Sequence, residues 1–165
     1  MDPAYDPQSW QNFFVMAGGS AAALTGLLFV AMSMHAKTIM GSRFYRTRAI
    51  GTLVSLTTQL VLAAAVLVPG QSLTVLGIEV EAGALLFVGI SIWAAAFRGS
   101  PVPLPRPRRI AEVSFGLVLI AFFVGSGVSL LIQSGGGLYL MAVAMLMSFG
   151  WNIYVAWVLI SEVSE

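Results

Sequence analysis

Residues 45–97 read YRTRAIGTLVSLTTQLVLAAAVLV, then PGQS, then LTVLGIEVEAGALLFVGISIWAAAF. Each of the two longer runs can cross a hydrocarbon core of about 30 Å as a helix that rises about 1.5 Å per residue. The four residues between them are uncharged and typical of a turn. This stretch therefore predicts a tight helical hairpin within a membrane.

The rest of the chain repeats this pattern. Only 9% of the 165 residues are charged and 58% are hydrophobic, whereas about 25% charged residues would be usual for a soluble domain. We expect an all-α, polytopic bundle that forms one domain over residues 1–165, with no soluble catalytic domain. Its five transmembrane helices are predicted at 10–35, 45–68, 73–97, 110–132 and 138–160.

The basic residues predict the orientation of the bundle. The segment Met1–Ser9 holds no basic residue, so it lacks the positive start of a secretory signal and the first span is expected to be retained. The positive-inside rule places basic loops in the cytoplasm, which puts the N-terminus outside and the C-terminus inside. All eight Lys and Arg residues lie in two loops: Lys37, Arg43, Arg46 and Arg48 in one, and Arg98, Arg106, Arg108 and Arg109 in the other.

The second basic loop is rich in proline. Between Pro101 and Pro107 every second residue is proline, and proline lacks the amide proton that a helix needs. We expect a stiff, extended strap. It either rests on anionic headgroups or binds a cytoplasmic partner.

A polar stripe runs along the second predicted span. Arg48, Thr52, Ser55 and Gln59 recur at spacings of four, three and four, which places them on one helix face. In one interpretation the stripe lines a narrow path or an oligomeric pore, with Gln59 near the constriction and Arg48 at the cytoplasmic mouth. In the other it supplies hydrogen bonds between helices, with Asn152 of the fifth span as a partner of Gln59.

Acidic residues within or beside the spans are few. Glu79 and Glu81 are expected near the outer boundary, about 200° apart on their helix, so they cannot pair within one chain. One of them would form an acidic ring at an outer mouth of an oligomer, or both would reach the headgroups. Glu112 follows Arg108 by four residues, a spacing that suits a local ion pair.

Small residues on the first span favour close helix contacts. Gly18, Ala22 and Gly26 lie at spacings of four, a pattern that lets helix backbones approach in lipid. This face favours a homo-oligomer, unless it is consumed within one protomer.

The residue inventory excludes several kinds of chemistry. The chain has no cysteine and one histidine, His35, which leaves no ligand set for the usual zinc, iron–sulfur or haem sites. It also has no phosphate-binding loop and no set of nucleophile, base and acid at one membrane depth. We expect no cofactor, no metal, no nucleic-acid partner and no enzymatic activity.

Several short motifs carry a family resemblance. They are Phe13–Val15, Ala21–Val30, Leu67–Ser72, Leu76–Glu79 and Gly135–Tyr139. With these motifs the chain resembles, nearly end to end, small actinobacterial multipass membrane proteins of uncharacterised function, some of them labelled "modulator of FtsH protease". The resemblance implies that Glu79 and the turn Pro69–Ser72 are family features. It also implies a location in the bacterial cytoplasmic membrane.

Two hypotheses about function follow. The first is a small homo-oligomeric channel or permeation protein with a polar path lined by the second span. The second is a non-enzymatic accessory or regulatory protein that binds another membrane protein, for example a membrane protease. A stripe buried against the fifth span, with Gln59 bonded to Asn152, would favour the second hypothesis.

Overall fold

The computed structural model describes residues 2–97 and 106–163, and all regular structure in that part of the chain is helical. Five helices are long and apolar enough to cross a membrane. This confirms the expected all-α fold with five helices of membrane-spanning length and composition. The elements are η1 (Pro3–Tyr5), η2 (Pro7–Trp10), α1 (Gln11–Met34), α2 (Ala36–Gly41), α3 (Arg43–Val66), α4 (Leu73–Phe97), α5 (Arg106–Ile132) and α6 (Gly137–Val163).

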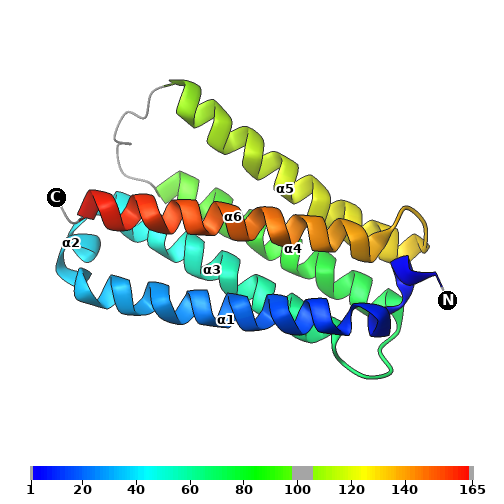
Figure 1. Ribbon diagram of the computed structural model, residues 1–165. Helices are drawn as coiled ribbons and strands as arrows, with labels where there is room; N and C mark the ends of the chain where they lie inside the picture. The colour runs from blue at the N-terminus through cyan, green and yellow to red at the C-terminus, as the bar shows by residue number, and fades with distance from the viewer. Residues whose placement is uncertain (1, 98–105, 164–165) are drawn as a thin grey trace.

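Helix α3 is the centre of the bundle. It packs against α1, α4 and α6, while α5 packs against α4 and α6. The four helices α3, α4, α5 and α6 therefore form a closed ring, and α1 covers the outer side of α3. Figure 1 shows that α5 lies close to α6 near the N-terminus of the chain and diverges from it toward the C-terminus.

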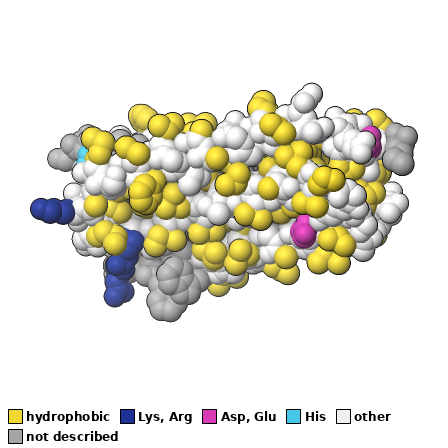
Figure 2. Space-filling model, turned by 90° about the horizontal axis from the view of Figure 1, so that it is seen from below, with side chains coloured by type: hydrophobic (Ala, Val, Ile, Leu, Met, Phe, Trp, Pro, Cys, Tyr) yellow, Lys and Arg dark blue, Asp and Glu magenta, His cyan; other side chains and the backbone are white. Residues whose placement is uncertain are grey.

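The two ends of the bundle differ in charge. We call the end where α1 and α6 finish and α3 and α5 begin the basic end, and the opposite end the N-terminal end (Figure 1). In Figure 2 the described Lys and Arg side chains gather at one end of the molecule, and acidic side chains lie toward the other. Between them the visible surface carries mostly apolar side chains, as lipid contact requires.

The helix boundaries differ from the predicted ones by a few residues. Helix α3 begins at Arg43, two residues early, because the Ser42 hydroxyl accepts a hydrogen bond from the Tyr45 amide at 3.5 Å and caps the helix. The predicted bounds of α4 agree with the structure.

The expected proline strap is shorter than predicted. Residues 101–105 lie outside the described part of the chain, but Arg106 and Pro107 already belong to α5, so the prediction of an extended strap as far as Pro107 is wrong there. A proline is tolerated in the first turn of a helix because the amide it lacks would have no partner in that turn.

The small-residue face of α1 is only partly used within one protomer. Ala22 and Gly26 are exposed, whereas the face toward the core carries Phe14, Ala17, Ala21 and Leu28. Only Gly18 makes the close contact expected of it: an added Cβ there would lie 3.3 Å from the Ala63 Cβ. The larger apolar side chains of α1 bury more area against α3 than the small residues would, and they decide its orientation.

Candidate functional site

The polar stripe of α3 faces the inside of the helix ring. Thr52, Ser55 and Gln59 are 4%, 7% and 2% exposed, and the Arg48 side chain is 14% exposed. These four residues share one helix face, as their spacing predicted.

Part of the stripe bonds to α6. The Asn152 amide nitrogen donates to the Ser55 hydroxyl at 2.9 Å, and the Gln59 amide nitrogen donates to the Ser148 hydroxyl at 3.0 Å. The two hydroxyls are 3.3 Å apart, and Asn152 also donates to Ser148 at 3.3 Å. Gln59 and Asn152 thus both donate to the Ser148 hydroxyl. We call these four residues the α3–α6 polar cluster.

Ser148 was missed in the sequence analysis. It lies four residues before Asn152, so both occupy one face of α6. This spacing was the signal that could have revealed it. A lone serine in an apolar helix is easily overlooked, because its hydroxyl can also bond back to its own backbone.

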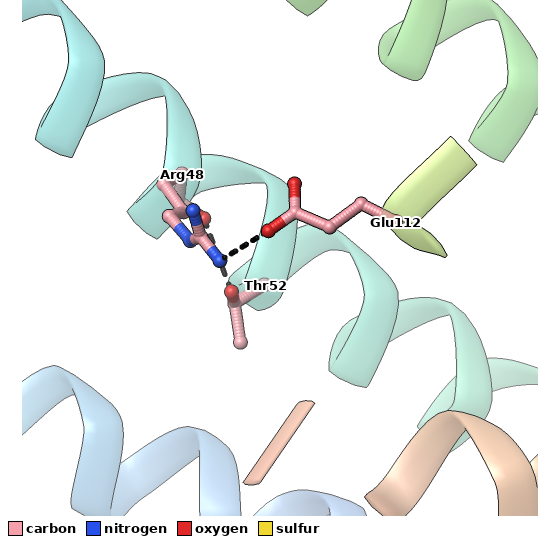
Figure 3. Close-up of polar contacts among 3 residues, drawn as sticks. All are labelled: Arg48, Thr52 and Glu112. Atoms are coloured by element: carbon pink, nitrogen blue, oxygen red, sulfur yellow. Dashed lines mark hydrogen bonds and ion pairs between the residues drawn. The ribbon is translucent and has the colours of Figure 1, made fainter. Parts of the chain in front are cut away.

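At the basic end of the stripe, Arg48 forms an ion pair with Glu112 of α5, with 3.1 Å between Nη2 and Oε1 (Figure 3). Thr52 donates its hydroxyl to the Arg48 carbonyl at 3.0 Å. The Arg48 guanidinium also lies 5.9 Å from the centre of the Phe44 ring, within reach of a cation–π interaction. Glu112 therefore pairs across the ring of helices, whereas the sequence suggested a local partner on α5. The Arg108 side chain lies outside the described part of the structure.

A cavity of about 160 Å³ lies beside this ion pair, inside the ring at the basic end. All four ring helices contribute to its wall, each with residues toward the basic end. Its polar and aromatic lining includes Arg48, Thr52, Ser55, Glu112, Phe115, Trp151 and Asn152.

A smaller cavity of about 20 Å³ lies deeper in the ring, lined in part by Ser55, Gln59 and Ser148. This volume suits about one water molecule. The Oε1 atom of Gln59 is buried there without a hydrogen-bond partner among the described residues. A buried acceptor without a partner is costly, so this oxygen reduces the net contribution of Gln59 to stability.

Beyond Gln59 the ring is filled with apolar side chains. This apolar layer separates the two cavities from the N-terminal end of the bundle. Its side chains are at most 8% exposed and come from all four ring helices: Leu62, Val66, Val80, Phe123, Met141 and Met145.

The two acidic residues of α4 lie away from these cavities' polar walls. Glu79 is exposed and accepts a hydrogen bond from Gln71 at 2.5 Å. Glu81 is half-buried against α5, where an added Cβ on Gly127 would lie 2.5 Å from its Oε1. They therefore occupy different faces of α4, in agreement with their spacing.

The N-terminal end of the bundle carries polar contacts that the sequence analysis missed. The Tyr5 hydroxyl accepts a hydrogen bond from the Gly136 amide at 2.7 Å and lies 3.2 Å from the Ser129 hydroxyl. Trp10 contacts Tyr139 edge to face, with 4.7 Å between ring centres. These contacts attach η1 and η2 to the loop between α5 and α6.

No metal-binding group of three or more His, Cys, Asp or Glu side chains occurs within residues 2–97 and 106–163. Comparisons with protein-family models, curated proteins and solved structures found no match. The geometry of the polar stripe and of the two cavities is therefore the basis for assigning a function.

Proposed function

We propose that the protein is a non-enzymatic accessory or regulatory membrane protein, which binds another membrane protein and does not itself conduct a solute. The basic end faces the cytoplasm of a bacterial cell in this proposal, as expected for a loop rich in Arg and Lys. The family resemblance is consistent with such a role.

One observation carries this proposal: the polar stripe ends inside the bundle. Its deepest residue, Gln59, bonds to α6, and the apolar layer fills the ring from there to the N-terminal end. The apolar layer has no polar groups to replace the hydration of a solute, which a conducting path needs. The hydroxyls buried beyond it, Ser126 and Ser129, bond to the Gly137 and Ser134 carbonyls. The stripe also has its hydrogen bonds within one chain, so it is not free to line an axis between copies.

The exposed face of α1 supports binding to another helix. An added Cβ on Gly19 or Gly26 would meet no atom within 4 Å, and Ala22 between them is exposed. Small residues on a lipid-facing surface allow a second helix to approach closely.

Crosslinking in the native host tests the accessory role. A photo-crosslinking residue in place of Ala22 should give adducts with a different protein, while the same residue at Val118, on the exposed side of α5, serves as the control. Adducts that contain only this chain would contradict the proposal.

The larger cavity favours a second candidate function, a homo-oligomeric permeation protein. Arg48, Thr52 and Ser55 line this cavity near the basic end, and Gln59 lies at the deep end of the stripe. Solute flux and conductance in liposomes distinguish the two functions. The accessory role predicts background flux for the wild type and for Gln59→Leu, whereas flux that Gln59→Leu alters would support permeation.

A further inference from the structure

The Arg48–Glu112 ion pair lies on the wall of the larger cavity and uses only part of the hydrogen-bonding capacity of its two side chains. It joins Nη2 to Oε1 at 3.1 Å, and the two side chains are 14% and 25% exposed. A guanidinium carries five N–H donors and a carboxylate has two acceptor oxygens. The contact uses one of each, so both groups retain hydrogen-bonding capacity toward a molecule in the cavity.

The paired charges restrict the class of molecule that fits. An ion pair that is partly removed from water gains little net stability, while a charge left there without a partner is costly. A bound anion would place a second negative charge beside Glu112, and a bound cation would place a second positive charge beside Arg48. A molecule with one charge of each sign gives both residues a partner.

The remaining cavity wall complements such a molecule. Thr52, Ser55 and Asn152 offer neutral polar groups. Phe115 and Trp151 stack with 4.8 Å between ring centres and 20° between planes, and aromatic faces attract ammonium groups. The wall also has space to spare, because an added Cβ on Gly51 or Gly116 would meet no atom within 4 Å.

We propose that this cavity binds a small zwitterion that carries an anionic phosphate or carboxylate and a primary amine. The anionic oxygens bind Arg48, and the ammonium binds Glu112 beside the aromatic pair. A phosphodiester of ethanolamine has this chemistry, either as a phospholipid headgroup or as free glycerophosphoethanolamine. The binding residues lie in the part of the ring nearer the basic end.

Binding of three soluble probes to the purified full chain in detergent tests the proposal. We expect glycerophosphoethanolamine to bind at least about tenfold more tightly than glycerophosphoglycerol, a phosphodiester with one negative charge, or ethanolamine, because each single charge leaves one residue without a partner of opposite charge. In lipid nanodiscs, native mass spectrometry then distinguishes the sources: retention of phosphatidylethanolamine over phosphatidylglycerol identifies a headgroup, and binding of the soluble probe alone identifies a free solute.

Variants separate the site from general stability. Arg48→Gln and Glu112→Gln should each abolish the preference for the zwitterion, whereas Arg43→Gln, an exposed arginine on the same helix, should keep it. Gly116→Leu fills the cavity and leaves the ion pair intact, so it should also abolish binding. Its control is Gly150→Leu, which replaces an exposed glycine of α6 with open space around it.

Results of two kinds would overturn the proposal, one from the probes and one from a variant. One is equal or tighter binding of a singly charged probe, or no binding of the zwitterion in either form. The other is binding that survives Gly116→Leu. Because these assays use the purified chain, their failure is distinguishable from failure of the accessory role, which is tested by crosslinking in the host.

Discussion

Gln59 and Asn152 carry the same functional group but differ in what their loss should cost. Asn152 donates to the hydroxyls of both Ser55 and Ser148. Gln59 donates to Ser148, but its own carbonyl oxygen is buried without a partner among the described residues. Removing Gln59 therefore also removes an unpaired acceptor, which offsets part of the lost hydrogen bond.

We predict that Asn152→Leu lowers the free energy of unfolding by about 1–2 kcal/mol more than Gln59→Leu, because the Ser55 hydroxyl loses its amide donor and no unpaired acceptor is removed in return. Unfolding by denaturing detergent measures both variants. Asn12→Leu, at an exposed position of α1, is the control. A larger loss for Gln59→Leu would show that its carbonyl has a partner, such as an ordered water.

We expect a modest coupling energy between Arg48 and Glu112 in the free energy of unfolding. Both side chains are mostly buried, so Arg48→Gln alone and Glu112→Gln alone each leave one charge in a poor environment. A double-mutant cycle on unfolding free energy should give a coupling of about 1 kcal/mol, between the values for surface and buried pairs. Additive losses in the double variant would contradict the ion pair.

The contact between α4 and α5 depends on two glycines near the N-terminal end. An added Cβ on Gly77 would lie 2.9 Å from the Leu131 Cγ and 3.1 Å from the Gly127 carbonyl oxygen. The helix backbones thus meet closely at this end, whereas α5 diverges from α6 at the basic end (Figure 1). The close contact fixes one end of α5 and leaves room for the cavity at the other.

We predict that Gly77→Leu destabilises the protein by about 2 kcal/mol, because the added side chain forces the two helices apart. Thermal unfolding in detergent measures the loss. Gly89→Leu on the same helix is the matched control, since an added Cβ there meets no atom within 4 Å. Equal stability of the two variants would contradict the close contact.

Sequence periodicity predicted which faces of the elements are polar but not which neighbours they meet. The 3.6-residue repeat placed Thr52, Ser55 and Gln59 on one face of α3. It could not identify Ser148 as their shared partner, nor choose between Arg108 and Arg48 as the partner of Glu112, because these choices depend on how helices distant in sequence pack. On α1, the pattern of small residues indicated a close-contact face, but it could not show that Gly18 packs within the bundle while Ala22 and Gly26 stay exposed.

The whole-molecule features were the most predictable. Apolar runs of membrane-spanning length can satisfy their backbone hydrogen bonds in lipid only as helices or closed barrels, so the class of fold followed from composition and segment length. The short, uncharged turns predicted the helical hairpins. The ring of four helices and its cavities could not be predicted, because they depend on helix tilt and side-chain shape.

The orientation of the bundle is a prediction that the cysteine-free chain makes easy to test. Single cysteines can replace Thr38 at the basic end and Ser134 at the N-terminal end, both exposed. On intact bacteria, a maleimide that cannot cross the membrane should label Ser134→Cys at once. It should label Thr38→Cys only after the cells are opened, and the reverse pattern would contradict the orientation.

The polar stripe of α3 bonds to α6 within the same chain and does not face an axis between copies. The Ser55 and Ser148 hydroxyls are 3.3 Å apart, close enough for a disulfide if both become cysteine. After oxidation in membranes, Ser55→Cys combined with Ser148→Cys should give an internally crosslinked monomer with altered gel mobility, and Ser55→Cys alone should remain an uncrosslinked monomer. A disulfide-linked dimer of Ser55→Cys alone would contradict the claim, because it would place the stripe at an axis between copies.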